Sequence, residues 1–235
     1  MNSHRSPRDG RLLSGALAFI FSASLAHAQS DEAPRGTLDV DRNLVRTGVH
    51  SQLEWNIEYP TGITEIVDIV PPNRIVPKKD VTMKVRVLGV SFQQSSTKLL
   101  PVDVYWSKNN SSWKKFFYGY EYDVDESEVL VRENISEGDV IDFGGRGWLS
   151  RWLTFHHTRK STNNLVVLKN GDTPPSYAPA FSQGDITSFI RPYLDSGGKV
   201  NIGDRDLILL WEVYSNRPGS TYFDMQDIMI MVTFE

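Results

Sequence analysis

Three acidic residues near the C-terminus have the types and spacing that a cation site requires. Glu212 follows an apolar run that begins at Leu207, and Asp224 and Asp227 come just before a second apolar run at 228–234. If these runs are antiparallel neighbours, the end of the first lies beside the start of the second, and the three carboxylates converge. Converging carboxylate oxygens suit Ca²⁺, which they bind at roughly 2.3–2.6 Å. The sequence therefore predicts a calcium site formed by Glu212, Asp224 and Asp227.

The same acids also have a purely structural interpretation. Asp224 and Asp227 would accept backbone N–H groups in a turn, and Glu212 would form an ion pair with Arg217. Pairs of carboxylates also flank the scissile bond in glycoside hydrolases. The chain has 29 acidic residues, and their spacing selects no such pair. We therefore assign no catalytic residue and favour a protein that is not an enzyme.

The region around these acids resembles a family of uncharacterised secreted bacterial β domains. In that family an aromatic-x-Glu-Asp element is followed by Asp-x-Asp-aromatic-Asn-Asp and an apolar strand. Within residues 211–235, Glu212 matches the first acid, and Asp224 and Asp227 match the later pair. Val213 and Gln226 depart from the pattern, because they stand where the family has an acid and an asparagine. The resemblance implies a secreted β domain and no particular activity.

Aromatic side chains form a second group that could bind a ligand. Tyr118, Tyr120 and Tyr122 alternate along the chain, which predicts a ladder of tyrosine rings on one face of a strand. Trp148 and Trp152 lie in a stretch with glycine and arginine that is typical of an exposed loop. Such rings can stack against sugars, and they can equally belong to the core. These five residues are the predicted glycan-binding residues, with burial as the alternative.

The elements that must position these groups have the pattern of β-strands. Apolar and polar residues alternate at 53–59, 83–88 and 102–106, as expected for half-buried strands. The segment 109–112 has the composition of a hairpin loop. Many short strands separated by turn residues predict an all-β fold, an antiparallel β-sandwich that is Ig-like or jelly-roll-like. Helical spacing at 185–195 predicts one short helix.

The N-terminus has the pattern of a secretory signal peptide. Arg5, Arg8 and Arg11 precede a mostly apolar stretch at 12–26, which ends in an Ala-His-Ala cleavage pattern at 26–28. A membrane anchor is the alternative, but the stretch is shorter than the roughly 20 residues that span a bilayer. We therefore expect residues 1–28 to be removed and no membrane-spanning segment to remain. The expected mature chain, 29–235, is one domain, with a subdivision near 150–162 as the alternative.

The net charge and the cysteine content limit which compartments and partners are possible for this protein. The net charge is −4, and loss of the net +2 of residues 1–28 (three Arg and one Asp) gives −6. An acidic chain without a basic run argues against nucleic acid as a partner. The chain has no cysteine, which excludes disulfides and thiolate sites and leaves stability to the core or to a metal. We expect a bacterial periplasmic or extracellular protein whose partner is a glycan or another cell-envelope component.

Overall fold

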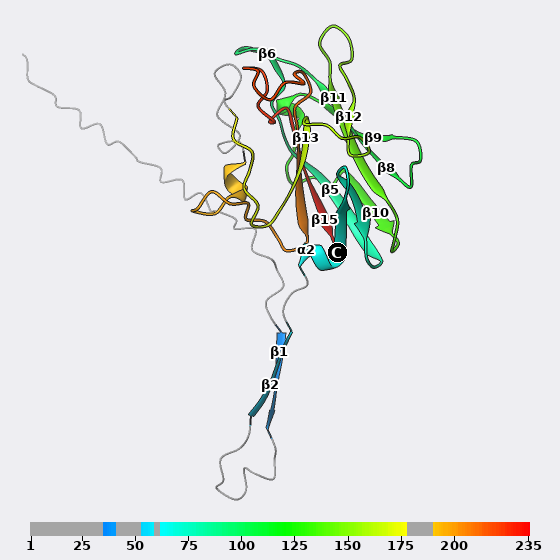
Figure 1. The fold of residues 1–235 in the computed structure, drawn as a ribbon, viewed down its shortest axis with the longest axis vertical. Helices are drawn as coiled ribbons and strands as arrows, with labels where there is room; N and C mark the ends of the chain where they lie inside the picture. The colour runs from blue at the N-terminus through cyan, green and yellow to red at the C-terminus, as the bar shows by residue number, and fades with distance from the viewer. Residues whose placement is uncertain (1–34, 41–52, 59–61, 178–189) are drawn as a thin grey trace, which may run out of the picture.

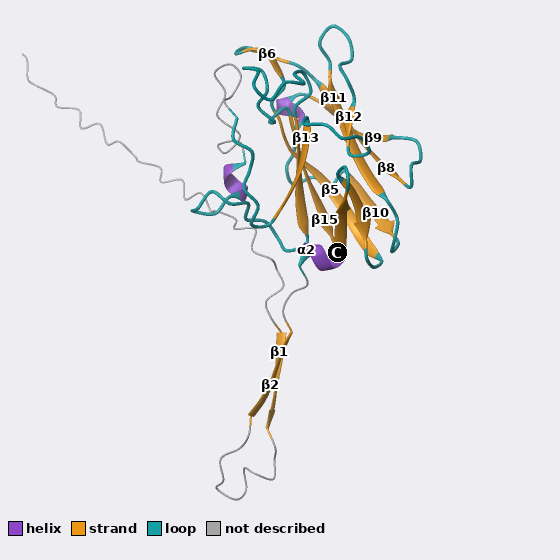
Figure 2. Ribbon diagram, viewed as in Figure 1, coloured by secondary structure: helices purple, strands orange, loops and turns teal. Residues whose placement is uncertain are grey.

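Two large antiparallel sheets dominate the chain (Figures 1 and 2). The computed structural model describes residues 35–40, 53–58, 62–177 and 190–235. The predicted signal peptide at 1–28 lies outside these residues. The two sheets pack against each other, which confirms the predicted all-β sandwich. Within the described ranges, no helix is both long and apolar enough to cross a membrane.

The five-stranded sheet has the order β10-β5-β15-β14-β13, and every neighbouring pair is antiparallel. Its strands are β10 (Val131–Ile135), β5 (Val81–Val90), β15 (Ile228–Phe234), β14 (Asp206–Trp211) and β13 (Leu165–Lys169). The two most apolar runs of the sequence are therefore adjacent strands in the middle of this sheet.

The second sheet has the order β3-β4-β11-β8-β9, and β12 also pairs with β11. Its strands are β3 (Val67–Val70), β4 (Arg74–Pro77), β11 (Ile141–Gly147), β8 (Val102–Lys108), β9 (Lys114–Gly119) and β12 (His156–His157). The predicted hairpin loop joins β8 to β9. Asn109 and Asn110 have φ values of 53° and 58° there, which asparagine tolerates in tight turns.

The remaining elements are small. Two further two-stranded sheets pair β1 with β2 and β6 with β7. Their strands are β1 (Arg35–Val40), β2 (Leu53–Glu58), β6 (Gln93–Ser95) and β7 (Lys98–Leu99), and the helical turns are α2 (Ile63–Ile66), η1 (Glu121–Asp123) and η2 (Arg191–Tyr193). Residues 185–189 of the helix predicted at 185–195 lie outside the described part, and residues 190–195 contain the 3₁₀ turn η2.

The main core lies between the two large sheets. Alternate residues of β8, namely Val102, Val104 and Trp106, point into it, as the period-two pattern predicts. β14 is apolar without interruption at 207–211, and β15 at 228–232, because both faces of their sheet are covered there. A second buried cluster lies on the far face, and includes Leu88, Ile190, Val200, Ile202, Ile208, Leu210, Phe223, Met225, Met229 and Met231.

Candidate metal centre

The acidic residues of interest lie where β14 ends and β15 begins. Trp211, the last residue of β14, pairs with Ile228, the first residue of β15. The backbone N–H of Asp227 donates to the carbonyl oxygen of Trp211 at 3.1 Å. Glu212 and Asp227 therefore lie side by side just beyond the last paired residues. The antiparallel neighbours expected from the sequence are present.

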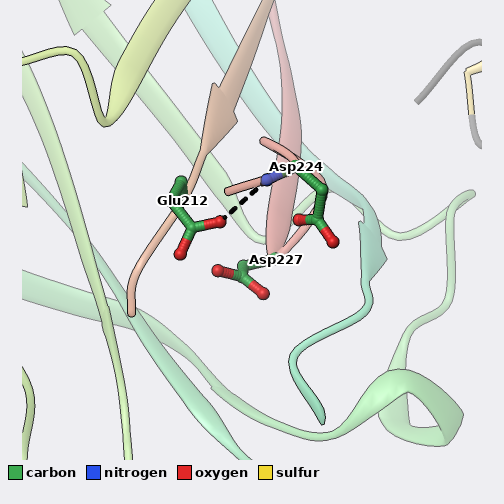
Figure 3. A group of neighbouring side chains, drawn as sticks. All are labelled: Glu212, Asp224 and Asp227. Atoms are coloured by element: carbon green, nitrogen blue, oxygen red, sulfur yellow. Dashed lines mark hydrogen bonds between the residues drawn. The ribbon is translucent and has the colours of Figure 1, made fainter. Parts of the chain in front are cut away.

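The loop that leads into β15 adds Asp224 to this pair. Phe223 and Met225 are buried in the second apolar cluster, whereas Asp224 and Asp227 approach Glu212 (Figure 3). Met225 has a φ of 62°, in the left-handed region that side chains of its size seldom adopt. Such a conformation costs on the order of 1–3 kcal/mol. This left-handed residue lies between Asp224 and Asp227, the two aspartates that approach Glu212.

The three carboxylates are close enough to share one ion. One oxygen from each lies within 4.8 Å of the other two. Glu212, Asp224 and Asp227 are only 0, 3 and 6% exposed. Two oxygens that each lie roughly 2.6 Å from one Ca²⁺ can be at most about 5.2 Å apart. The observed separation fits that limit, and Figure 3 shows the three groups around a common space.

Backbone N–H groups orient the Glu212 carboxylate. Its Oε1 accepts hydrogen bonds from the N–H groups of Tyr214 and Ser215, both at 2.8 Å. Its Oε2 accepts one from the N–H of Asp224 at 3.1 Å, the dashed line in Figure 3. In the described part of the chain, no ion pair joins Glu212 to Arg217, so that part of the structural interpretation is wrong.

The two aspartates also accept backbone N–H groups, as the structural interpretation expected. Asp227 Oδ2 accepts the N–H of Val213 at 2.7 Å, and Asp224 Oδ1 accepts that of Gln226 at 3.4 Å. These bonds fix the side chains without neutralising them, because a backbone N–H brings no net charge. The turn geometry and the convergence of carboxylates are therefore present together.

Burial and mutual repulsion make these groups reluctant to ionise. Burial raises the pKa of Glu212, and the neighbouring charge of Asp224 adds to this effect against the backbone hydrogen bonds. Burial also raises the pKa of Asp227 well above its usual range, with repulsion from Glu212 and Asp224 as the next causes. A bound cation would remove this repulsion and displace protons from the carboxyl groups.

The cluster opens into a cavity of about 220 Å³. The residues that line it are Ser91, Phe92, Gln93, Gln94, Leu149, Glu212, Tyr214, Tyr222, Asp224 and Asp227. Among these described residues there is no Lys, Arg or His to balance the carboxylates. The donor set consists of oxygen and amide groups, which suits a hard cation such as Ca²⁺ and not a metal that prefers nitrogen or sulfur.

Sequence spacing missed one further oxygen at this cavity. Gln93 Oε1 is buried and accepts no hydrogen bond, and Gln93 is among the lining residues. Gln93 begins β6, more than a hundred positions before Glu212, so no local pattern links the two. Only the pairing of β5 with β15 brings this segment to the cluster.

The five predicted glycan-binding residues fall into two groups. β9 ends at Gly119, so the ladder of three tyrosines on one strand is wrong, and Tyr120 and Tyr122 instead stack on each other at η1, 5.1 Å apart. Tyr118 lies 6.3 Å from Trp152, which lies 5.1 Å from Trp148. Tyr118 is 54% and Trp148 39% exposed, so this second group has surface that a ligand can reach.

Comparison of the chain with protein-family models, curated proteins and solved structures gives no match. The geometry of the site is therefore the basis on which a function can be assigned.

Proposed function

We propose that this chain is an exported, non-catalytic β-sandwich protein with a binding or structural role at the cell envelope, stabilised by one Ca²⁺. Glu212, Asp224 and Asp227 hold the ion. The observation that carries the proposal is the burial of three carboxylates within 4.8 Å of one another, with no cationic side chain among the described residues of the cavity. Burying three like charges close together is costly, and Ca²⁺ offsets their mutual repulsion.

The remaining coordination of the ion comes from neutral oxygens. Ca²⁺ takes roughly 6–8 oxygen ligands, and three carboxylates supply between three and six. Gln93 Oε1 and water provide the others. The ion then links the end of β14, the start of β15 and the segment that follows β5. Its role is to hold these segments together in a chain without disulfides.

A thermal melt with millimolar Ca²⁺, and again with a chelator, tests this function. A ligand at about 100 times its dissociation constant stabilises by roughly 2.7 kcal/mol, which is about 5–10 °C for a chain of this size. We expect that shift in the unmodified protein and in Asp206→Asn, which alters a half-buried carboxyl at the opposite end of β14. We expect no shift in Asp224→Asn. A melt unaffected by Ca²⁺ in the unmodified protein would overturn the proposal.

Glycan binding is a second candidate, supported by the meeting of Tyr118, Trp152 and Trp148 at the surface. Exposed rings of this kind stack on the apolar faces of sugars. Retardation in native gels that contain soluble glycans tests it. We expect Trp148→Ala to lose the retardation, whereas migration unchanged across a broad panel would contradict this candidate.

A further inference from the structure

The outer face of the six-stranded sheet differs from its inner face in a regular way. In β8, Asp103, Tyr105 and Ser107 alternate with the core residues, so they point outward. Their partners on β11 are Arg146, Gly144 and Asp142, respectively. The outer face of β8 and β11 therefore carries charged and aromatic groups. Small polar residues on this face would be enough to keep the protein soluble.

These groups form a continuous row of rings and guanidinium groups. Along the face, the contacts are Arg159 over Trp113 (4.3 Å), Trp113 to Phe155 (5.0 Å), Phe155 to Tyr105 (5.4 Å), Arg146 over Tyr105 (5.7 Å) and Arg146 over Trp152 (4.3 Å). Trp152 continues to Tyr118, which also lies under Lys115. We call this set the ring–guanidinium row.

Gly144 allows the middle of the row to lie close to the sheet. A Cβ atom at this position would come within 2.4 Å of the Phe155 ring and 3.0 Å of the His157 side chain. Any larger residue would therefore push Phe155 away from Tyr105. The absence of a side chain at 144 leaves room for Phe155, which meets Tyr105 and Trp113 edge to face, at interplanar angles of 88° and 83°, between the two charged ends.

A buried carboxylate anchors the charged group at one end. Asp142 accepts hydrogen bonds from Arg74 Nε and Nη2 at 2.9 and 2.7 Å, and from Arg159 Nε at 2.8 Å. Burial opposes ionisation of Asp142, but the hydrogen bonds from Arg74 and Arg159 prevail and lower its pKa. Two guanidinium groups thus share one carboxylate, which leaves an excess positive charge.

The other end is built in the same way. Asp103 accepts hydrogen bonds from Arg146 Nε and Nη2 at 3.3 and 3.1 Å and from the Tyr105 hydroxyl at 2.7 Å, and Lys115 Nζ lies 3.8 Å from it. In the described structure, none of these hydrogen bonds uses Nη1 of Arg146, nor that of Arg74 or Arg159. All three arginine side chains remain partly exposed. Each guanidinium group is therefore held through its Nε and Nη2 atoms, and its Nη1 donors remain for a ligand.

We propose that the ring–guanidinium row binds a polysaccharide that carries carboxylates, such as a polymer of uronic acids. The proposal rests on the glycan-binding candidate and adds a ligand class to it. Sugar rings lie against Trp113, Phe155 and Tyr105, and carboxylates pair with the guanidinium groups, whose planar fork matches them. The anchored ends are four residues apart on β8, or about 14 Å.

The sparse charge of the row favours a uronic acid polymer over nucleic acid. The row and its two anchoring carboxylates together carry few charges. The cations Lys115, Arg146 and Arg159 of the row, with Arg74 at the Asp142 anchor, face two buried aspartates, which leaves a net +2 on a chain whose overall charge is −4. Duplex DNA carries one charge per about 1.7 Å and requires many phosphate contacts. An acidic polysaccharide presents both apolar ring faces and carboxylates, and the row presents three rings between two guanidinium groups.

Affinity electrophoresis of the purified protein tests the proposal. A chelator is present, so that calcium binding at the acidic cluster does not contribute to the result. The probes are polygalacturonate, its methyl ester, a neutral glucan and oligo(dT). We expect retardation by polygalacturonate about tenfold stronger than by the methyl ester or the glucan, and none by oligo(dT). A tenfold change in affinity corresponds to about 1.4 kcal/mol, which is close to what a hydrogen bond to a charged group contributes.

Exposed members of the row give variants that keep the fold. We expect Tyr118→Ala to weaken polygalacturonate binding about tenfold and Lys115→Gln about threefold, because exposed charges contribute less than stacked rings. Lys199→Gln is the matched control, since Lys199 lies near η2 and outside the row, and it should bind normally. Melts in chelator check that each variant is folded.

The outcomes separate this proposal from the glycan-binding candidate. Equal binding of polygalacturonate and its methyl ester would overturn the acidic specificity and leave glycan binding standing. Comparable binding of oligo(dT) would overturn it in favour of nucleic acid. Retardation by none of the glycans would overturn both. Normal polygalacturonate binding by the folded Tyr118→Ala and Lys115→Gln proteins would overturn the assignment of the ring–guanidinium row and leave glycan binding standing.

Discussion

Among the residues that the structure describes, buried carboxylates occur at two places, one on the outer side of the six-stranded sheet and one at the end of the five-stranded sheet. Asp142 is surrounded by Arg74, Arg159 and the hydroxyl of Thr158, and its pKa is lowered although burial opposes this. Asp227 lies beside the carboxylates of Glu212 and Asp224, and burial and repulsion raise its pKa.

The two sites differ in the source of the positive charge that balances the carboxylates. At Asp142 the counter-charge comes from Arg74 and Arg159, so this carboxylate needs no bound ion to be stable in its ionised form. At Asp227 the described residues that line the cavity bring carboxylates and no cationic side chain, and protons or a cation would relieve the repulsion between the carboxylates. The same residue type thus serves an internal ion pair in one sheet and a candidate ligand in the other.

The same substitution at the two aspartates gives the largest contrast. Asp142→Asn leaves the two guanidinium groups without a counter-charge, and we expect a loss of about 2–3 kcal/mol in the free energy of unfolding. This is below the ~3–5 kcal/mol of a fully buried pair, because the arginines can be rehydrated. Urea denaturation in chelator measures it. Unchanged stability would show that the arginines do not depend on this carboxylate.

Asp227→Asn should behave in the opposite way. Because it removes one of three repelling charges and keeps an oxygen for the Val213 N–H, we expect metal-free stability to be unchanged or higher by up to about 1 kcal/mol. The stabilisation by Ca²⁺ should disappear. The matched control is Asp206→Asn, which should keep its response to Ca²⁺. A large loss of stability in chelator would instead indicate that Asp227 is an ordinary structural acceptor.

The pH dependence should also have opposite signs at the two sites. The raised pKa values of Glu212 and Asp227 mean that bound protons stabilise the metal-free fold below about pH 4.5. This contribution is lost as pH rises through the higher folded values. The lowered pKa of Asp142 gives stability that is present above pH 3.8 and lost at lower pH.

Melts across pH 4–8 in chelator measure the cluster's contribution as the difference between the unmodified protein and Asp227→Asn. We expect the advantage of the variant to grow as pH rises, and to vanish when Ca²⁺ is added. A difference independent of pH would contradict the coupling of the three carboxylates.

Gln93→Met gives the smallest expected effect. The substitution removes a buried oxygen that accepts no hydrogen bond, so metal-free stability should change by less than about 1 kcal/mol. If Gln93 is a ligand, the affinity for Ca²⁺ should fall about three- to tenfold. Calcium titration of the variant measures this, and Gln94→Met is a control from the same cavity wall. Equal affinity in both variants would remove Gln93 from the ligand set.

Much of this arrangement could be predicted from the sequence. The continuous apolar runs at 207–211 and 228–232 predict neighbouring buried strands, and adjacency of antiparallel strands is enough to bring Glu212 and Asp227 together. Gln93 and the left-handed Met225 could not be predicted, because they depend on distant pairing and on tertiary packing of the loop.

The tyrosine ladder shows where alternation misleads. Tyr118, Tyr120 and Tyr122 have strand periodicity, but Asp123 Oδ2 accepts the backbone N–H of Tyr120 at 2.9 Å and starts a 3₁₀ turn. Local hydrogen bonds from an aspartate compete with the sheet. The ring–guanidinium row was missed for a different reason, since its members come from β8, β9, β11 and the segments around β12.

Isothermal titration of the metal-free protein with Ca²⁺ tests the central claim most directly. The account predicts one ion per chain, an affinity that rises with pH, and proton release seen as a heat that varies with the ionisation enthalpy of the buffer. Asp227→Asn should bind much more weakly. The absence of a binding heat across pH 6–8, or equal binding by the unmodified protein and Asp227→Asn, would contradict the account.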